Sequence, residues 1–146
     1  MSATAGDDIV AVLDACVLLP ASLRDTLLRL AETPQFYIPK WSDQIWEEVT
    51  RNLESRRKLS PAKIAHLTEQ VQLHFPEAHV DGYERLTALM TNDPKDRHVV
   101  AAAVKANAQV IVTSNLKDFP PSSLAAWEIE ARHPDQYLMD LYCPRS

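Results

Sequence analysis

Acidic residues stand where apolar segments of this chain begin or end, and they are the residues most able to do chemistry. Asp14 directly follows the apolar run at residues 9–13, and Asp118 comes shortly after a second apolar run. Asp93 and Asp96 precede an alanine-rich segment. Carboxylates that share one cleft repel one another, and they stay ionised together when a cation neutralises them. The pattern therefore predicts a cation site.

Glu48 is a further candidate, because it stands beside a stripe of apolar residues with helical spacing. It lies three residues after Ile45 and next to Val49, whereas Glu47 is turned from it by about 100°. Oxygen ligands without thiolates or paired imidazoles suit Mg²⁺ or Mn²⁺ rather than Zn²⁺. Such an ion orients a water molecule and stabilises charge on a scissile phosphate, which favours phosphoryl-transfer chemistry.

Each acid also has a purely structural interpretation. Asp93 precedes a proline and suits a helix N-cap, and Asp96 at the third helical position suits the helix dipole. Asp118 fits a turn, and Glu48 fits a solvated helix face. Asp14 is the hardest to explain in this way, because an acid between apolar residues is costly to bury unless it is paired or bound to a metal.

Alternating strands and helices must position these side chains. The sequence predicts strands at residues 9–13, 36–38, 78–80, 109–113 and 127–129, and helices at residues 20–30, 43–53, 61–75, 84–90, 94–107 and 134–141. Pro39 is expected to close the second strand. This alternation predicts an α/β fold with a parallel sheet covered by helices on both faces. Ligands of such sheets bind beyond the carboxyl ends of the strands, where the strand order reverses.

Composition narrows the function classes. The chain has 146 residues, which suits one domain, and its two glycines, Gly6 and Gly82, exclude a Gly-rich phosphate-binding loop. The formal net charge is −5, so any contact with nucleic acid must depend on a local basic patch. Residues 51–63 supply such a patch, which is either a solvated helix end or a contact for a phosphate backbone. Its basic residues are Arg51, Arg56, Arg57, Lys58 and Lys63.

The cysteines and histidines carry little further chemistry. Cys16 and Cys143 form no disulfide framework, and Cys16 is interpreted as a small buried apolar side chain. The histidines show no metal-binding spacing, and His98 is the one that follows the acids directly. No apolar run approaches the roughly 20 residues that span a bilayer, and the acidic start is unlike a signal peptide, so we expect a cytoplasmic protein.

Four segments, taken together and in order, resemble the PIN-domain family, and within it the bacterial VapC-like toxin ribonuclease branch. They are Asp14 after its strand, Glu48 in residues 46–49, residues 92–98, and residues 110–120. The resemblance extends over about residues 8–140, so it implies a single PIN-like domain over residues 1–146. It also implies a three-layer α/β/α sandwich with a central parallel sheet of about four to five strands.

The resemblance implies an activity and partners. These are Mg²⁺- or Mn²⁺-dependent endoribonuclease activity on RNA, the role of toxin in a toxin–antitoxin pair, and a small antitoxin protein as partner. The many apolar side chains on the early helices also suit a homodimer. Asp14, Glu48 and Asp96 match three acids of the family that serve as catalytic residues and metal ligands. The fourth family position is Asn115 here, which carries no charge, and Asp118 is expected to replace it. The supporting residues would be Asp93, Thr113 and Asn115, with Arg51, Arg56, Arg57 and Lys58 binding RNA.

Two other interpretations stay open at this point. A haloacid-dehalogenase-like phosphatase also begins with an acid after a strand, but its second acid is absent from the triplet Asp14, Ala15, Cys16. A catalytically degenerate PIN-like module that binds RNA or protein is the non-enzymatic alternative, favoured by Asn115. Related proteins often continue in further helical sequence past the point where this one ends at Ser146, which suggests a contribution from elsewhere.

Overall fold

One parallel sheet organises the part of the chain that this computed structural model describes, residues 9–32 and 36–142. Within it, five strands lie in the order β3-β2-β1-β4-β5, and all neighbouring pairs are parallel. Their bounds are β1 Val10–Leu13, β2 Ile38–Ser42, β3 His79–Val80, β4 Val110–Val112 and β5 Glu130–Arg132.

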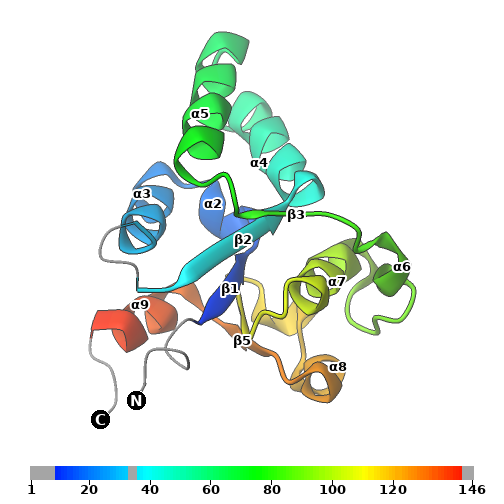
Figure 1. Cartoon of the computed structure of the whole chain (residues 1–146). Helices are drawn as coiled ribbons and strands as arrows, with labels where there is room; N and C mark the ends of the chain where they lie inside the picture. Colours follow the sequence, from blue (N-terminus) through cyan, green and yellow to red (C-terminus); the bar gives the residue numbers. More distant parts are fainter. Residues whose placement is uncertain (1–8, 33–35, 143–146) are drawn as a thin grey trace.

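Helices cover both faces of the sheet. The α-helices are α2 Ala15–Leu18, α3 Ala21–Leu30, α4 Asp43–Ser55, α5 Pro61–His74, α6 Glu84–Thr87, α7 Arg97–Lys105, α8 Pro121–Leu124 and α9 Pro134–Tyr142, and the 3-10 helices are η1 Pro94–Asp96, η2 Leu116–Asp118 and η3 Ala125–Trp127. Figure 1 shows α3 and α9 on one side of the sheet and α7 and α8 on the other. The expected three-layer α/β/α arrangement is confirmed. In the described residues, no helix is both long and apolar enough to cross a membrane.

The order of the strands reverses beside β1. The chain moves outward from β1 to β2 and β3, and then returns past β1 to form β4 and β5. Asp14 follows β1 and Thr113 follows β4, so both residues lie at this reversal, and the backbone N–H of Asp14 donates to the carbonyl of Val112 at 3.1 Å. A sheet of this kind offers its ligand-binding crevice at this point.

The core lies between the central strands and the alanine-rich helix α7. The side chains of β1 from Ala11 to Leu13 and those of Ile111 and Val112 in β4 are fully buried, as are residues 99–103 of α7. Burying a valine or leucine side chain contributes roughly 1.5–3 kcal/mol relative to leaving it exposed. Because α7 packs against both β1 and β4, the acidic turn η1 that precedes it is held against the end of the sheet.

Strand β2 contradicts the expectation that Pro39 closes the second strand, because Pro39 lies inside it. The N–H of Ile38 donates to Ile9 beside β1, whereas that of Trp41 donates to Ala78 on the β3 side. Alternation along the strand makes Pro39 face the same side as Trp41. There, β3 pairs only with the last two residues of β2, so no hydrogen bond is lost at Pro39.

Three further segments differ from the sequence-based expectation. The last strand, β5, spans Glu130–Arg132 rather than the expected residues 127–129. The expected segment is instead taken up by the end of η3 and by Glu128, whose backbone is left-handed with φ 58°. The helix expected at residues 94–107 begins as the 3-10 turn η1 and becomes α-helical only at Arg97. The four-residue helix α2 was not expected, since it is too short to show a periodic pattern.

Candidate active site

Asp14 is the best-fixed acid at the rim of the sheet. Its side chain caps α2, where Oδ1 accepts from the N–H of Ala15 at 2.8 Å, and Oδ2 accepts from the hydroxyl of Thr113 at 2.9 Å. Thr113 Oγ1 in turn accepts from the N–H of Asn115 at 3.0 Å. Asp14 is 4% exposed and Thr113 is fully buried. The ends of β1 and β4 are thus joined through a buried carboxylate.

Cys16 belongs to the same polar network, so its interpretation as an apolar buried side chain is wrong. Its Sγ lies 3.5 Å from Asp14 Oδ2 and 3.5 Å from Thr113 Oγ1, and it accepts from the N–H of Ser114 at 3.3 Å. Burial, followed by the charge of Asp14, raises the pKa of the thiol to about 11. Cys16 is therefore a neutral thiol at pH 7 that donates to the carboxylate. The sequence offered no signal for this, because the contact joins residues 97 positions apart. Cys143 lies outside the described residues.

Helix α4 carries Glu48 to the same rim. Ser42 caps the helix by accepting from the N–H of Ile45 at 3.1 Å, as its sequence predicts. Beside the buried face of α4, Glu48 is half-buried, whereas Glu47 is exposed. Burial, and next the charge of Asp14, raise the pKa of Glu48. Glu48 and Asp14 therefore lie within each other's electrostatic field.

The turn η1 supplies two acids in different environments. Asp93 caps the turn, because its Oδ1 accepts from the backbone N–H of Lys95 at 3.2 Å, and this bond lowers its pKa. Asp96 is 8% exposed and makes no capping hydrogen bond. Burial, and then the charge of Asp14, raise the pKa of Asp96 to about 6. Asp93 thus has the structural role that its sequence indicates, whereas Asp96 is buried with little compensation.

Lys95 connects these acids to Asp118. Its Nζ lies 3.1 Å from Asp118 Oδ2, 3.3 Å from Asp93 Oδ1 and 3.4 Å from Asp96 Oδ2. Asp118 is buried at the end of η2, whereas Asn115 is exposed. Of the two candidates for the fourth position, Asp118 is therefore the one that joins the other acids.

Asn92 and His98 are buried polar residues around η1 whose place the sequence did not reveal. Asn92 Nδ2 donates to the carbonyl of Asp118 at 3.3 Å, and its own carbonyl accepts from Arg97 Nε at 2.8 Å. The first of these bonds joins Asn92, which precedes the η1 turn, to the end of η2, and the second, to the backbone carbonyl of Asn92, is local. Burial lowers the pKa of His98, although the charge of Asp14 opposes this shift, so burial favours the neutral imidazole. In the sequence, Asn92 is only the residue before the predicted helix N-cap Asp93.

The acids fit a cation, although they are not already arranged around one. Among the described residues, no three Asp, Glu, His or Cys side chains converge into a group that could hold a metal ion. The acids instead form two sets, and Asp96 belongs to both. In the first set, the charge of Asp14 acts on Glu48 and on Asp96. In the second set, the ammonium of Lys95 joins Asp96 to Asp93 and Asp118. Asp96 Oδ2 is buried and accepts no hydrogen bond from the described residues. An oxygen-rich set with such an atom suits a hard divalent cation.

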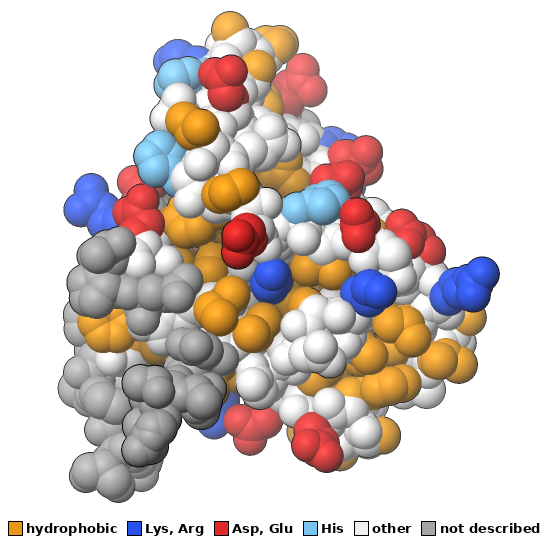
Figure 2. Space-filling view, viewed as in Figure 1, with side chains coloured by type: hydrophobic (Ala, Val, Ile, Leu, Met, Phe, Trp, Pro, Cys, Tyr) orange, Lys and Arg blue, Asp and Glu red, His pale blue; other side chains and the backbone are white. Residues whose placement is uncertain are grey.

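Of the four basic residues predicted to contact RNA, two lie close enough to the rim to act on Glu48. Arg51 is on α4, and Arg56, Arg57 and Lys58 follow in the loop to α5; all four are exposed. The charges of Arg51 and Arg56 partly oppose the rise in the pKa of Glu48, so these two guanidinium groups act on the acid. On the face drawn in Figure 2, by contrast, Lys and Arg side chains stand apart from one another rather than forming a stripe.

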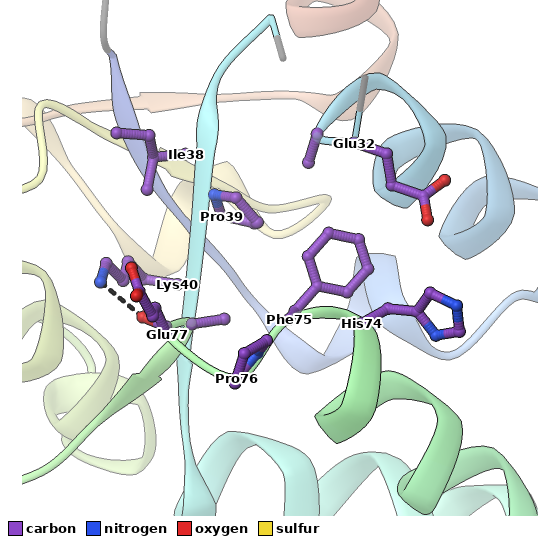
Figure 3. A pocket seen from close by; sticks show the side chains of 10 residues that line it. Glu32, Ile38, Pro39, Lys40, His74, Phe75, Pro76 and Glu77 are labelled. Carbon is purple, nitrogen blue, oxygen red and sulfur yellow. Dashed lines mark hydrogen bonds between the residues drawn. The ribbon is translucent and has the colours of Figure 1, made fainter. Parts of the chain in front are cut away.

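A pocket of about 400 Å³ lies elsewhere, at the beginning of β2 (Figure 3). Lys40 Nζ bridges it by donating to the carbonyl of Glu77 at 2.7 Å, and Phe75 forms part of its wall. Ile38 in this pocket pairs with Val10 at the start of β1, whereas Asp14 follows the end of that strand. The pocket is therefore separate from the acidic rim.

Comparisons with known proteins relate this chain to a protein family and to a curated relative. A PIN domain family model matches residues 10–117, a range that includes Asp14, Glu48 and Asp96 and ends one residue before Asp118. A stretch of 59 residues is 56% identical to "Putative ribonuclease VapC50" of Mycobacterium tuberculosis (strain ATCC 25618 / H37Rv). That stretch covers 40% of this chain and 35% of the relative, so the chain spans about a third of the length of the protein that it matches.

Proposed function

Because the chain belongs to the PIN domain family, whose model matches well over half of its length, we propose that it is a divalent-metal-dependent endoribonuclease. The observation that carries this proposal is the buried Asp96, whose Oδ2 accepts no hydrogen bond from the described residues while the charge of Asp14 acts on it. Lys95 brings one positive charge to within 3.4 Å of this oxygen but gives it no hydrogen bond, so the two neighbouring carboxylates are fully neutralised only by a further cation close by. The partial match to a protein named as a ribonuclease supports RNA as the substrate.

The proposed ligands come from four separate parts of the chain: the end of β1, helix α4, and the turns η1 and η2. Asp14, Glu48, Asp96 and Asp118 would hold Mg²⁺ or Mn²⁺, with the hydroxyl of Thr113 fixing the orientation of Asp14. A bound divalent cation supplies a water nucleophile at neutral pH and neutralises charge that develops on the phosphate. Asp93 contributes by fixing the backbone of η1 next to Asp96, and Asn115 by closing the turn around Thr113.

The exposed basic segment is proposed to bind the RNA backbone. Arg51, Arg56, Arg57 and Lys58 are exposed around the end of α4, and the first two act electrostatically on Glu48. A chain with a net charge of −5 needs such a local patch to bring a polyanion to an acidic rim. Phosphate contacts of this kind position the strand without reading its sequence.

The test compares two neighbouring glutamates on α4. Single-stranded RNA is incubated with wild type, Glu48→Gln and Glu47→Gln in Mn²⁺ and in EDTA. We expect wild type and Glu47→Gln to cleave in Mn²⁺ only, and Glu48→Gln to be at least 100-fold slower, the range in which single catalytic groups act. Equal rates for the two variants would remove Glu48 from the site. Absence of both cleavage and Mn²⁺ binding in the wild type would favour the non-catalytic module.

The partners follow from the same proposal. A VapC-like ribonuclease would be the toxin of a toxin–antitoxin pair and would be bound by a small antitoxin. Residues 1–146 would form a single domain, and two copies of it would form a homodimer. Exposed large apolar side chains are available for such contacts. Among the described residues they include Phe36, Leu73, Leu89, Leu116 and Met139. Light scattering of the purified protein tests the dimer, since a monomer at micromolar concentration would contradict it.

A further inference from the structure

Lys95 is an unusual surface lysine, because its charged end is directed at the acids. Its side chain is 66% exposed, yet Nζ lies within 3.1–3.4 Å of three carboxylates: Asp93, Asp96 and Asp118. A lysine with this exposure would ordinarily keep its ammonium in water. Here the ammonium lies where the two sets of acids meet.

An ammonium group satisfies these acids only in part. Of the three, Asp118 Oδ2 receives a side-chain hydrogen bond from Nζ, whereas the buried Asp96 Oδ2 is near the charge but accepts no hydrogen bond from the described residues. A lysine brings one positive charge and three donors, and a hard divalent cation brings two charges and takes six or more oxygen ligands. The carboxylates therefore carry more negative charge and more acceptor oxygens than Lys95 satisfies.

The ammonium of Lys95 and a bound metal ion would compete for the same carboxylate oxygens. Asp96 and Asp118 are proposed metal ligands, and Nζ lies 3.4 Å from Oδ2 of the first and 3.1 Å from Oδ2 of the second. Metal–oxygen distances of about 2.0–2.6 Å leave no space for an ammonium on the inner side of these atoms. Repulsion between the two positive charges acts in the same direction.

Building on the proposed function, we propose that Lys95 is an internal competitor for the divalent cation: its ammonium neutralises Asp96 and Asp118 in the metal-free protein and must leave them before the cation binds. The flexible stem and the exposure of Lys95 allow this exchange without movement of the buried core. Lys95 would thereby lower the affinity of the site for its metal.

The test is Mn²⁺ titration by calorimetry of the wild type, Lys95→Met and Lys95→Arg. Removing one competing, solvent-screened charge predicts that Lys95→Met binds Mn²⁺ about tenfold more tightly than wild type. Lys95→Arg keeps the charge and should bind as weakly as the wild type. Lys117→Met is the matched control, because it removes the same charge from the neighbouring turn η2. Lys117 forms no ion pair with the described residues. Equal or weaker binding by Lys95→Met overturns the proposal.

Thermal unfolding gives an independent measure of the same exchange. Without metal, Lys95→Met should melt at a lower temperature than wild type, because the acids lose their counter-charge, and it should gain more from added Mn²⁺. An equal gain in both proteins contradicts competition. If wild type binds Mn²⁺ and Lys95→Met binds it equally well, only the inference on Lys95 fails. If neither protein binds Mn²⁺, the metal-dependent function itself fails.

Discussion

Replacing Asp96 by asparagine should stabilise the metal-free protein at neutral pH while removing the proposed ribonuclease activity. The pKa of Asp96 is raised to about 6, mainly by burial, from an ordinary value near 4. The folded state therefore binds the proton more tightly than the unfolded chain does. The stability that protonated Asp96 contributes is fully present below about pH 4 and is lost as the pH rises through about 6.

The magnitude follows from that shift. A difference of about two pKa units corresponds to roughly 1–3 kcal/mol of stability lost at pH 7, and Asp96→Asn should recover most of it. For a chain of this size that is a rise in melting temperature of roughly 3–10 °C. At pH 4 the variant and wild type should melt at nearly the same temperature, because Asp96 is then protonated in the folded wild type.

The assay is thermal unfolding in EDTA between pH 4 and pH 8, with Asp93→Asn as the matched control. Asp93 stands three residues earlier in the same turn, but its pKa is lowered by the hydrogen bond from the N–H of Lys95. Its charge is stabilising above its ordinary pKa, so Asp93→Asn should lower the melting temperature at pH 7. An Asp96→Asn variant no more stable than wild type at pH 7, or equally stabilised at pH 4, would refute the reasoning.

Two further predictions concern the hydroxyl of Thr113 and the basic loop. Thr113→Val should destabilise the protein by about 2–3 kcal/mol in urea unfolding, since it removes a buried donor to the carboxylate of Asp14, whereas Thr113→Ser should retain most of the stability; equal stability of the two variants would contradict this. Arg56→Gln combined with Arg57→Gln should weaken binding of single-stranded RNA and reduce its salt dependence by a slope of about 1.4, because two phosphate contacts are lost. Arg85→Gln, an exposed arginine on α6, should leave that slope unchanged.

The parts of the fold set by local pattern could be predicted from the sequence. The runs that form β1 and β4 are apolar on both faces, which is typical of central parallel strands, and Asp14 had to follow the first of them at the rim. Helical geometry alone distinguished the half-buried Glu48 from the exposed Glu47. These predictions depend on a few neighbouring residues, for which pattern and propensity agree.

The parts of the fold and site that depend on contacts between distant segments could not be predicted from the sequence. The position of Lys95 among the acids depends on Asp118, 23 residues away, and the network of Cys16 depends on Thr113, 97 residues away. The shift of the last strand came from the left-handed conformation of Glu128, which a non-glycine residue seldom adopts. The roles of Asp14, Glu48, Asp96 and Asp118 as metal ligands stay predictions.

The proline inside β2 has a consequence for what the open half of that strand can bind. Where β3 has not yet begun, Pro39 turns a carbonyl oxygen but no amide hydrogen towards the outside. An extended peptide that paired with β2 at this position would lack one hydrogen bond, because Pro39 has no N–H to donate. Amyloid-like or edge-to-edge association through this margin is thereby disfavoured. A molecule lodged in the adjoining pocket would have to be recognised by side chains such as Phe75 and Lys40 (Figure 3).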